Sequence, residues 1–282
     1  MMKTTVSFLG LGKMGAVMAP LFLQAGYQLT VYNRDLKKTT LLTDAGAKLA
    51  VNPKEACESS EVIFTMLSDD HAIQSVFNGD KGLLSADIQG KLFIDMSTLQ
   101  VETVKSISEA VIKQGADFID APVSGTVAPA ADGNLMIFCG GMSSVIERAK
   151  PLLELLSRRI IHAGDIGSGA LLKLVVNLPL AVYWQSLAEA MSLGSSGGLE
   201  DDLMLDAIAD SSAALAVLTM KIPTILGDDL PVAFDMKGME KDLNSILRTA
   251  REFNLKLPTT SSVLNSYSEA IEEGQMGSRD AV

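Results

Sequence analysis

A single lysine stands among apolar residues in the stretch GSGALLKLVVN, which runs from Gly167 to Asn177. Lys173 and Asn177 are four residues apart, so in a helix they share one face. A lysine in such a setting is either a surface residue whose stem covers apolar side chains or a functional group. The amide on the same face favours the functional interpretation, in which the ammonium exchanges a proton with a reacting oxygen.

A glycine-rich segment with the pattern G-x-G-x-x-G follows the first apolar run of the chain. It consists of Gly10, Leu11, Gly12, Lys13, Met14 and Gly15. The run before it is typical of a strand and the residues after it of a helix, which is the context of a dinucleotide site. Gly10 would form the tight turn, Gly12 would admit a pyrophosphate, and Gly15 would let helix and strand pack closely. The helix N-terminus adds free N–H groups and partial positive charge.

The second apolar run ends in Tyr32, Asn33, Arg34 and Asp35. A cofactor without a 2′-phosphate usually meets an acidic residue here. Asn33 does not repel a phosphate, and the Arg34 guanidinium can bind one with two N–H groups. The segment therefore favours NADP(H), with NAD(H) possible because Asp35 is next in the chain. The alternative is a surface Arg–Asp pair without a cofactor role.

Two further strand ends are expected at the carboxyl edge of the same sheet, where ligands bind in open α/β folds. The residues expected to line the cofactor there are Met66, Leu67, Ser68, Ser97 and Thr98. Asp69 is predicted to cap the next helix. For Ser97 and Thr98 two interpretations stay open, a helix cap or a contact on the nicotinamide side.

A loop rich in small residues follows Asp120 and reads APVSGT. The hydroxyl of Ser124 and N–H groups around Gly125 and Thr126 could hold a carboxylate. An ordinary turn rich in Ser, Gly and Pro fits the same residues.

The elements that position these groups alternate in type. Apolar runs with strand character alternate with helical stretches up to about Gly164, which predicts βαβ units and a parallel sheet. Beyond that point helical segments follow one another, beginning with a long apolar stretch from Gly169 to Leu193. We therefore expect an α/β Rossmann-like domain over residues 1–164. An all-α domain that opens with a long interdomain helix is expected over residues 165–282.

Composition limits the function classes. The 282 residues carry a formal net charge of −11, which disfavours a nucleic-acid binder. Two isolated cysteines and two isolated histidines provide no metal-site or disulfide pattern. The uncharged stretch from Met14 to Asn33 is broken by polar residues and Pro20, so no membrane span is expected. The start MMKTTVSFLGLG resembles a signal peptide only faintly and lacks a small-residue cleavage site. We expect a cytoplasmic protein.

The motifs together resemble the β-hydroxyacid dehydrogenase family, which includes 3-hydroxyisobutyrate dehydrogenases and glyoxylate/succinic semialdehyde reductases. The resemblance extends over nearly the whole chain. It is carried, in the family order, by GLGKMG, NR, MLSDD, DAPVSG, the Gly169–Lys173–Asn177 spacing and the late KDL at 241–243.

The resemblance implies a catalytic lysine at Lys173, with Asn177 helping to hold the substrate. Ser124 and Gly125 would bind the substrate carboxylate. Lys241 would lie near nicotinamide and substrate, with Phe234 packed nearby. Without the resemblance, Lys241 and Asp242 would be interpreted as a charge pair on a helix surface.

Two features depart from the family pattern. Thr126 stands where many members have a second glycine, and the segment after Gly274 is short. The resulting prediction is an NADP(H)-preferring oxidoreductase that interconverts a short hydroxy acid and its semialdehyde or keto form. Such an enzyme is expected to be a homodimer or homotetramer. The alternatives are an imine reductase on the same scaffold, which the lysine disfavours, and a non-catalytic dinucleotide sensor.

Overall fold

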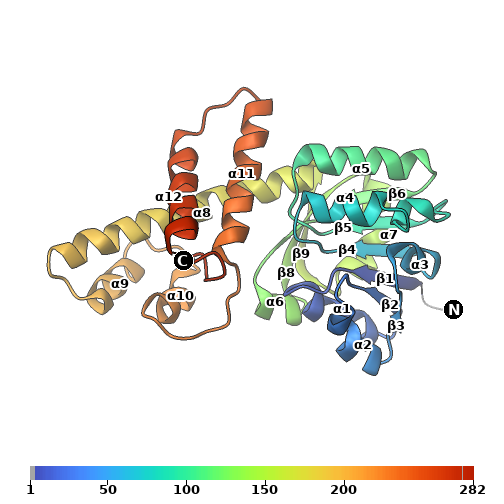
Figure 1. The fold of residues 1–282 in the computed structure, drawn as a ribbon, viewed down its shortest axis with the longest axis horizontal. Helices are drawn as coiled ribbons and strands as arrows, with labels where there is room; N and C mark the ends of the chain where they lie inside the picture. The colour runs from blue at the N-terminus through green and yellow to red at the C-terminus, as the bar shows by residue number, and fades with distance from the viewer. Residues whose placement is uncertain (1–3, 275) are drawn as a thin grey trace. The chain divides into compact units, whose positions relative to one another are not determined.

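A computed structural model describes residues 4–274 and 276–282 (Figure 1). The chain forms two compact units, Met1–Leu174 and Val175–Val282. The first three residues, where the comparison with a signal peptide begins, lie outside the described residues. The units divide within a helix, ten residues after the boundary expected from the sequence, and each is described by itself.

The first unit is built on a mixed sheet whose order is β3-β2-β1-β4-β5-β6-β8-β7, with β9 paired to β8. Neighbours run parallel, except that β8 is antiparallel to β6 and β7. The described strands are β1 Thr5–Leu9, β2 Gln28–Tyr32, β3 Lys48–Leu49, β4 Val62–Thr65, β5 Leu92–Asp95, β6 Asp117–Asp120, β7 Val123–Ser124, β8 Leu135–Gly140 and β9 Ser157–Gly164. The Rossmann-like prediction is confirmed, because the apolar runs pair as a mostly parallel sheet.

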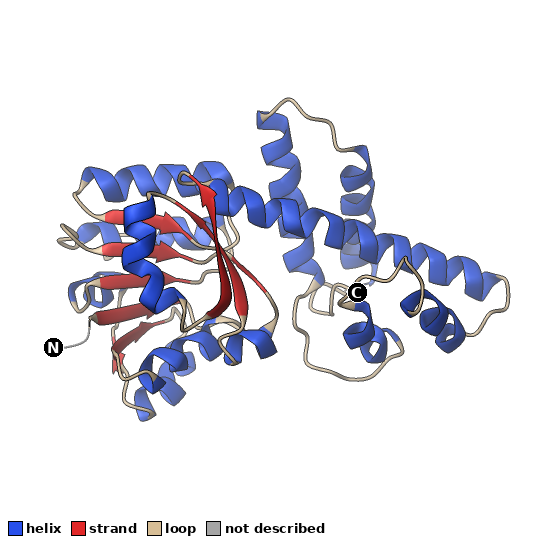
Figure 2. Cartoon of the chain, turned by 180° about the vertical axis from the view of Figure 1, so that it is seen from behind, coloured by secondary structure: helices blue, strands red, loops and turns tan. Residues whose placement is uncertain are grey.

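Helices cover both faces of this sheet (Figure 2). They are α1 Gly15–Gln24, α2 Thr40–Asp44, α3 Pro53–Glu58, α4 Asp70–Asn78, α5 Val101–Lys113, α6 Val127–Ala131 and α7 Ser143–Leu153, with short 3₁₀ turns η1 Leu36–Thr39 and η2 Leu83–Ser85. Helix α1 ends in a Schellman motif, in which Gly26 has φ +77° and Tyr27 N–H donates to Phe22 O. Phe8, Phe22 and Phe64 are fully buried and pack together between α1 and the sheet.

The helices of the second unit account for its regular structure among the described residues, apart from an isolated antiparallel bridge between Asp235 and Asp280. Its elements are α8 Ser168–Ser196, which begins in the first unit, then α9 Asp201–Ala209, α10 Leu218–Ile225, α11 Met236–Glu252 and α12 Pro258–Gly274. Helices α11 and α12 lie side by side (Figure 1). Trp184 of α8, Leu205 of α9, Leu218 of α10 and Leu243 of α11 are among the buried residues of one core.

Candidate active site

The glycine-rich turn between β1 and α1 has a separate structural reason for each glycine. Gly10 has φ +100°, and a Cβ there would overlap the Met66 carbonyl. A Cβ at Gly15 would overlap the Gly10 carbonyl oxygen, so only glycine lets the helix start this close to the strand. Gly12 is exposed and a Cβ on it would meet nothing within 4 Å. The open approach to Gly12 and the first turn of α1 fit the pyrophosphate of a dinucleotide.

The segment after β2 does two different things. Asn33 Oδ1 accepts from Leu11 N–H at 2.9 Å and its Nδ2 donates to Asp35 O, so this side chain fastens the glycine-rich turn to the end of β2. Asp35 Oδ1 accepts from Lys37 N–H and caps η1. Arg34 is exposed and has no ion-pair partner among the described residues. No Arg34–Asp35 ion pair is found among the described residues, and the cofactor role of Arg34 stays a prediction.

The ends of β4 and β5 are joined by a hydrogen-bonded chain. Leu67 N–H donates to Ser97 Oγ at 2.9 Å, and Ser97 Oγ donates to Asp95 Oδ1 at 2.7 Å. Thr65 Oγ1 donates to the same oxygen at 2.7 Å. Burial raises the pKa of the Asp95 carboxyl to about 7, and the hydrogen bonds from Thr65 and Ser97 oppose that rise only in part.

Helix caps near these strand ends match the sequence prediction in one case and differ in the other. Asp69 caps α4 as predicted, accepting from Ala72 N–H at 2.8 Å. Neither Ser97 nor Thr98 caps α5, whose N-cap is Gln100. Ser97 is 1% exposed, and its hydroxyl accepts from Leu67 N–H in the turn after β4. The contacts predicted between the cofactor and Met66, Leu67, Ser68, Ser97 or Thr98 stay predictions.

The loop predicted to bind a carboxylate lies between β7 and α6. Ser124 is half-buried, and its hydroxyl has no hydrogen-bond partner among the described residues. Gly125 is exposed at φ +136°, and a Cβ there would press on Leu135 Cδ2 at 2.6 Å. Thr126 is the N-cap residue of α6 and makes no side-chain cap. The Ser124 hydroxyl therefore lies next to Gly125, whose positive φ favours glycine.

Lys173 and Asn177 both lie on α8, one turn apart on one face. Asn177 is 5% exposed, and its Nδ2 donates to Asp242 Oδ2 of α11 at 2.6 Å. The other Asp242 oxygen lies 3.0 Å from Lys241 Nζ. Asp242 is 1% exposed, so the alternative of a charge pair on a helix surface is wrong for this residue. A carboxylate can only accept hydrogen bonds, so Asp242 fixes the Asn177 side chain with the NH₂ group toward Asp242 and the amide oxygen pointing away from it.

Phe234 lies two residues before α11, and Lys241 lies within this helix. A Cβ at Gly238 would lie 2.7 Å from the Phe234 ring, so this glycine lets the ring lie against the first turn. Asp235 caps the helix by accepting from Gly238 N–H at 2.9 Å. The Phe234 carbonyl accepts from Ala281 N–H, so a hydrogen bond joins the segment at Ala281 to the segment that precedes α11.

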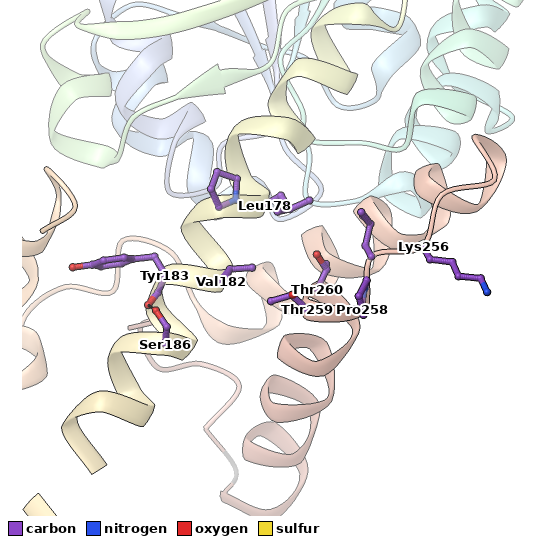
Figure 3. A pocket seen from close by; sticks show the side chains of 10 residues that line it. Leu178, Val182, Tyr183, Ser186, Lys256, Pro258, Thr259 and Thr260 are labelled. Carbon is purple, nitrogen blue, oxygen red and sulfur yellow. Dashed lines mark hydrogen bonds between the residues drawn. The ribbon is translucent and has the colours of Figure 1, made fainter. Parts of the chain in front are cut away.

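A groove of about 560 Å³ lies entirely within the second unit. Val182 of α8 and Thr259 and Thr260 of α12 converge on it, and Lys256 points away (Figure 3). None of the predicted site residues lines this groove, although it begins next to Asn177 at Leu178.

Comparison with known proteins assigns both units. Residues 5–164 match the family model described as the NAD binding domain of 6-phosphogluconate dehydrogenase. Residues 167–282 match the model described as NAD-binding of NADP-dependent 3-hydroxyisobutyrate dehydrogenase. The chain belongs to the β-hydroxyacid dehydrogenase family.

Individual relatives agree with the family assignment. Glyoxylate/succinic semialdehyde reductase 1 of Arabidopsis thaliana is 33% identical over 94% of this chain and 92% of its own length. A 3-hydroxyisobutyrate dehydrogenase of Pseudomonas aeruginosa is 34% identical over 94% and 91%. The solved structure of Mycobacterium tuberculosis 3-hydroxyisobutyrate dehydrogenase with L-serine has a TM-score of 0.89 at 28% identity, covering 99% of this chain and 97% of that one.

The chain is thus an NAD(P)-dependent hydroxyacid dehydrogenase acting on CH–OH groups. Sequence reasoning missed one residue of the site, Asp242. The only available signal was its place after Lys241 in the KDL motif, because the partner that gives it a task, Asn177, is 65 positions away.

Proposed function

We propose that this protein reduces short carboxylated aldehydes, of the glyoxylate or succinic semialdehyde type or the semialdehyde of 3-hydroxyisobutyrate, with NADPH as the preferred donor. The observation that carries the proposal is the pair on α8. Lys173 shares a helix face with Asn177, whose amide a buried carboxylate holds in one orientation. Such a pair can bind and protonate an oxygen on which negative charge develops.

Lys173 has the chemistry that this reaction needs. When bound, the cofactor supplies a hydride to the carbonyl carbon, and the carbonyl oxygen then gains negative charge. The Lys173 ammonium donates a hydrogen bond to that oxygen and then a proton, and in the oxidative direction the neutral amine takes the proton back. One N–H of Asn177 Nδ2 goes to Asp242, so its Oδ1 is left to accept from the ammonium or the substrate hydroxyl, and its second N–H is left to donate.

Neutral donors hold the substrate carboxylate in this proposal. The Ser124 hydroxyl has no partner among the described residues, and the N–H groups at Gly125 and Thr126 belong to the same loop. The family resemblance implies that Lys241 would add positive charge near the substrate and the nicotinamide, with Phe234 nearby. Charge-assisted hydrogen bonds of this kind favour substrates that carry a carboxylate.

Arg34 supports the preference for NADP(H). It is exposed and not engaged by Asp35, whose carboxylate caps η1 instead. A guanidinium binds a phosphate with two parallel N–H groups, whereas it gains little from a ribose hydroxyl. The description of the second family model as NADP-dependent points the same way.

The proposal includes a cytoplasmic homodimer or homotetramer. Large apolar side chains are exposed in the second unit, among them Leu193 at 78%, Met220 at 69% and Leu203 at 58%. Exposed apolar surface of this kind is typical of an interface. By length and composition alone, helix α8 is also long and apolar enough to cross a membrane. Core helices of soluble proteins can have the same length and composition. Light scattering of the purified chain measures the assembly directly.

The decisive experiment follows NADPH absorbance with a panel of semialdehydes, 2-keto acids, uncharged aldehydes and a cyclic imine. Lys173→Ala should lower kcat by about 10²–10⁴-fold while leaving NADPH binding and thermal unfolding unchanged, because general acid catalysis supplies about that factor. Lys173→Arg should not restore turnover, since a guanidinium holds its proton too tightly. Near-wild-type turnover in the alanine variant, or faster reduction of the imine than of any aldehyde, would refute the proposal.

A further inference from the structure

A buried carboxylate outside the proposed chemistry lies at the end of β6. Asp120 is fully buried, and its Oδ1 accepts from Gly167 N–H at 2.8 Å. Its Oδ2 accepts from Ala170 N–H, also at 2.8 Å. These amides belong to the beginning of α8, where N–H groups have no acceptor within the helix. One side chain from the sheet therefore satisfies two amides of the helix that carries Lys173.

The space around this carboxylate is made by two glycines. A Cβ at Gly140 of β8 would overlap Asp120 Oδ1. A Cβ at Gly169 of α8 would lie 2.8 Å from Oδ2 and overlap the Phe138 carbonyl. The helix therefore begins in direct contact with the sheet. Burial raises the pKa of Asp120, and the hydrogen bonds from the helix amides oppose that rise only in part.

Two predicted site residues of the first unit follow the residues of this contact closely in the chain. Ser124 follows Asp120 by four residues, and Lys173 follows Ala170 by three. We propose that Asp120 is a positioning residue, which holds the start of α8 against the end of β6 and thereby sets Lys173 relative to the Ser124–Gly125 loop. This inference rests on the proposed roles of Lys173 and that loop.

The competing explanation is that Asp120 only stabilises the fold. Asp95 provides a matched control, because it is the register partner of Asp120 on β5 and is equally buried. Its hydrogen bonds are with Thr65 and Ser97, neither of which belongs to α8. A variant at Asp95 thus changes a buried carboxylate in the same layer without releasing the helix.

The test uses Asp120→Asn in the full chain. The amide keeps the volume and one accepting oxygen, but its NH₂ group faces an N–H donor, so one end of the contact is lost. We expect kcat to fall on the order of 10²-fold, since a misplacement of about 1 Å can cost that much. The KM for NADPH should stay within about twofold, and amide hydrogen exchange over residues 167–170 should accelerate.

A double-mutant cycle separates positioning from stability. In the Lys173→Ala background, Asp120→Asn should cost less than about threefold in kcat, because the group it positions is gone. Asp95→Asn should cost the same factor in both backgrounds. An equal loss from Asp120→Asn in both backgrounds, or fast exchange at residues 167–170 with unchanged kcat, would overturn the inference.

Two safeguards complete the design. If Asp120→Asn does not fold, Asp120→Ser fits the same space with a single acceptor and should give the same pattern. If Lys173→Ala keeps near-wild-type turnover, the proposed function fails on its own. Amide hydrogen exchange at residues 167–170 still reports whether Asp120 holds the start of α8. Exchange that is the same in Asp120→Asn as in the wild type would show that it does not.

Discussion

Asp95 makes the stability of the first unit depend on pH in a direction opposite to that of most carboxylates. Burial raises its pKa from 3.8 to about 7, and its Oδ2 has no hydrogen-bond partner among the described residues. Between about pH 4 and pH 7 the native state keeps a proton that the unfolded state has released. The free energy of unfolding therefore falls as pH rises through this window.

The magnitude follows from the size of the shift. A rise of roughly three pKa units corresponds to about 4 kcal/mol, all of it lost above pH 7. Asp95→Asn removes the titration but keeps an oxygen that accepts from Thr65 and Ser97. Its NH₂ group replaces the oxygen without a partner and costs about 1–3 kcal/mol at every pH. The stability difference, variant minus wild type, should rise by about 4 kcal/mol between pH 4 and pH 8.

Urea unfolding followed by circular dichroism at four pH values measures this difference, because groups that do not interact with Asp95 titrate equally in both proteins and cancel. Thr65→Val is the directional control, since it removes a hydrogen bond that lowers the pKa of Asp95 and should extend the window to higher pH. A difference that stays constant within about 1 kcal/mol from pH 4 to pH 8 would show that Asp95 does not bind a proton more tightly on folding.

Four other substitutions test the ligand sites and the glycine-rich turn. Arg34→Ala should weaken NADPH binding by about one to two decades and NADH binding by less than about threefold, since a charged hydrogen bond contributes about 1.5–3 kcal/mol. Equal losses of kcat/KM with NADPH and with NADH would show that Arg34 does not contact the 2′-phosphate. Ser124→Ala should raise KM for carboxylated aldehydes by about tenfold and leave uncharged aldehydes unchanged, as steady-state kinetics would show. Gly12→Ala should fold normally yet weaken cofactor binding, whereas Gly15→Ala should lower Tm because its Cβ overlaps the Gly10 carbonyl; the opposite order would contradict the geometry of the turn.

Elements with a long or strongly patterned sequence were predictable. Strand β2 ends at Tyr32, where the second apolar run of the sequence ends, and the long apolar stretch from Gly169 to Leu193 lies within α8. Several short elements were not predicted, and β3 and α10 are two examples. Strand β3 is two exposed residues at the edge of the sheet, and α10 is a short helix that contains Pro223. Neither is long enough to show a period, so tertiary contacts rather than pattern define them.

The same limit applies to the site. The glycine-rich turn was predictable because each glycine answers a local backbone requirement. Asp242, Asp120 and Asp95 were not, because a carboxylate looks identical in sequence whether water or a distant amide surrounds it. Their partners lie 65, 47 and 30 positions away, and only the fold brings these together.

Two neighbouring strand ends show why such placement matters for the chemistry. Asp95 and Asp120 are register partners, and repulsion from Asp120 is one of the smaller causes that raise the pKa of Asp95 after burial itself. Asp120 faces two N–H donors and holds the positive end of α8, so its charge is matched there. Asp95 supports the turn at Leu67, on the side expected to face an anionic cofactor, where a second negative charge would oppose binding. The N–H donors at Asp120 stabilise a carboxylate at the start of α8, whereas Asp95 has fewer such donors and keeps its proton up to about pH 7.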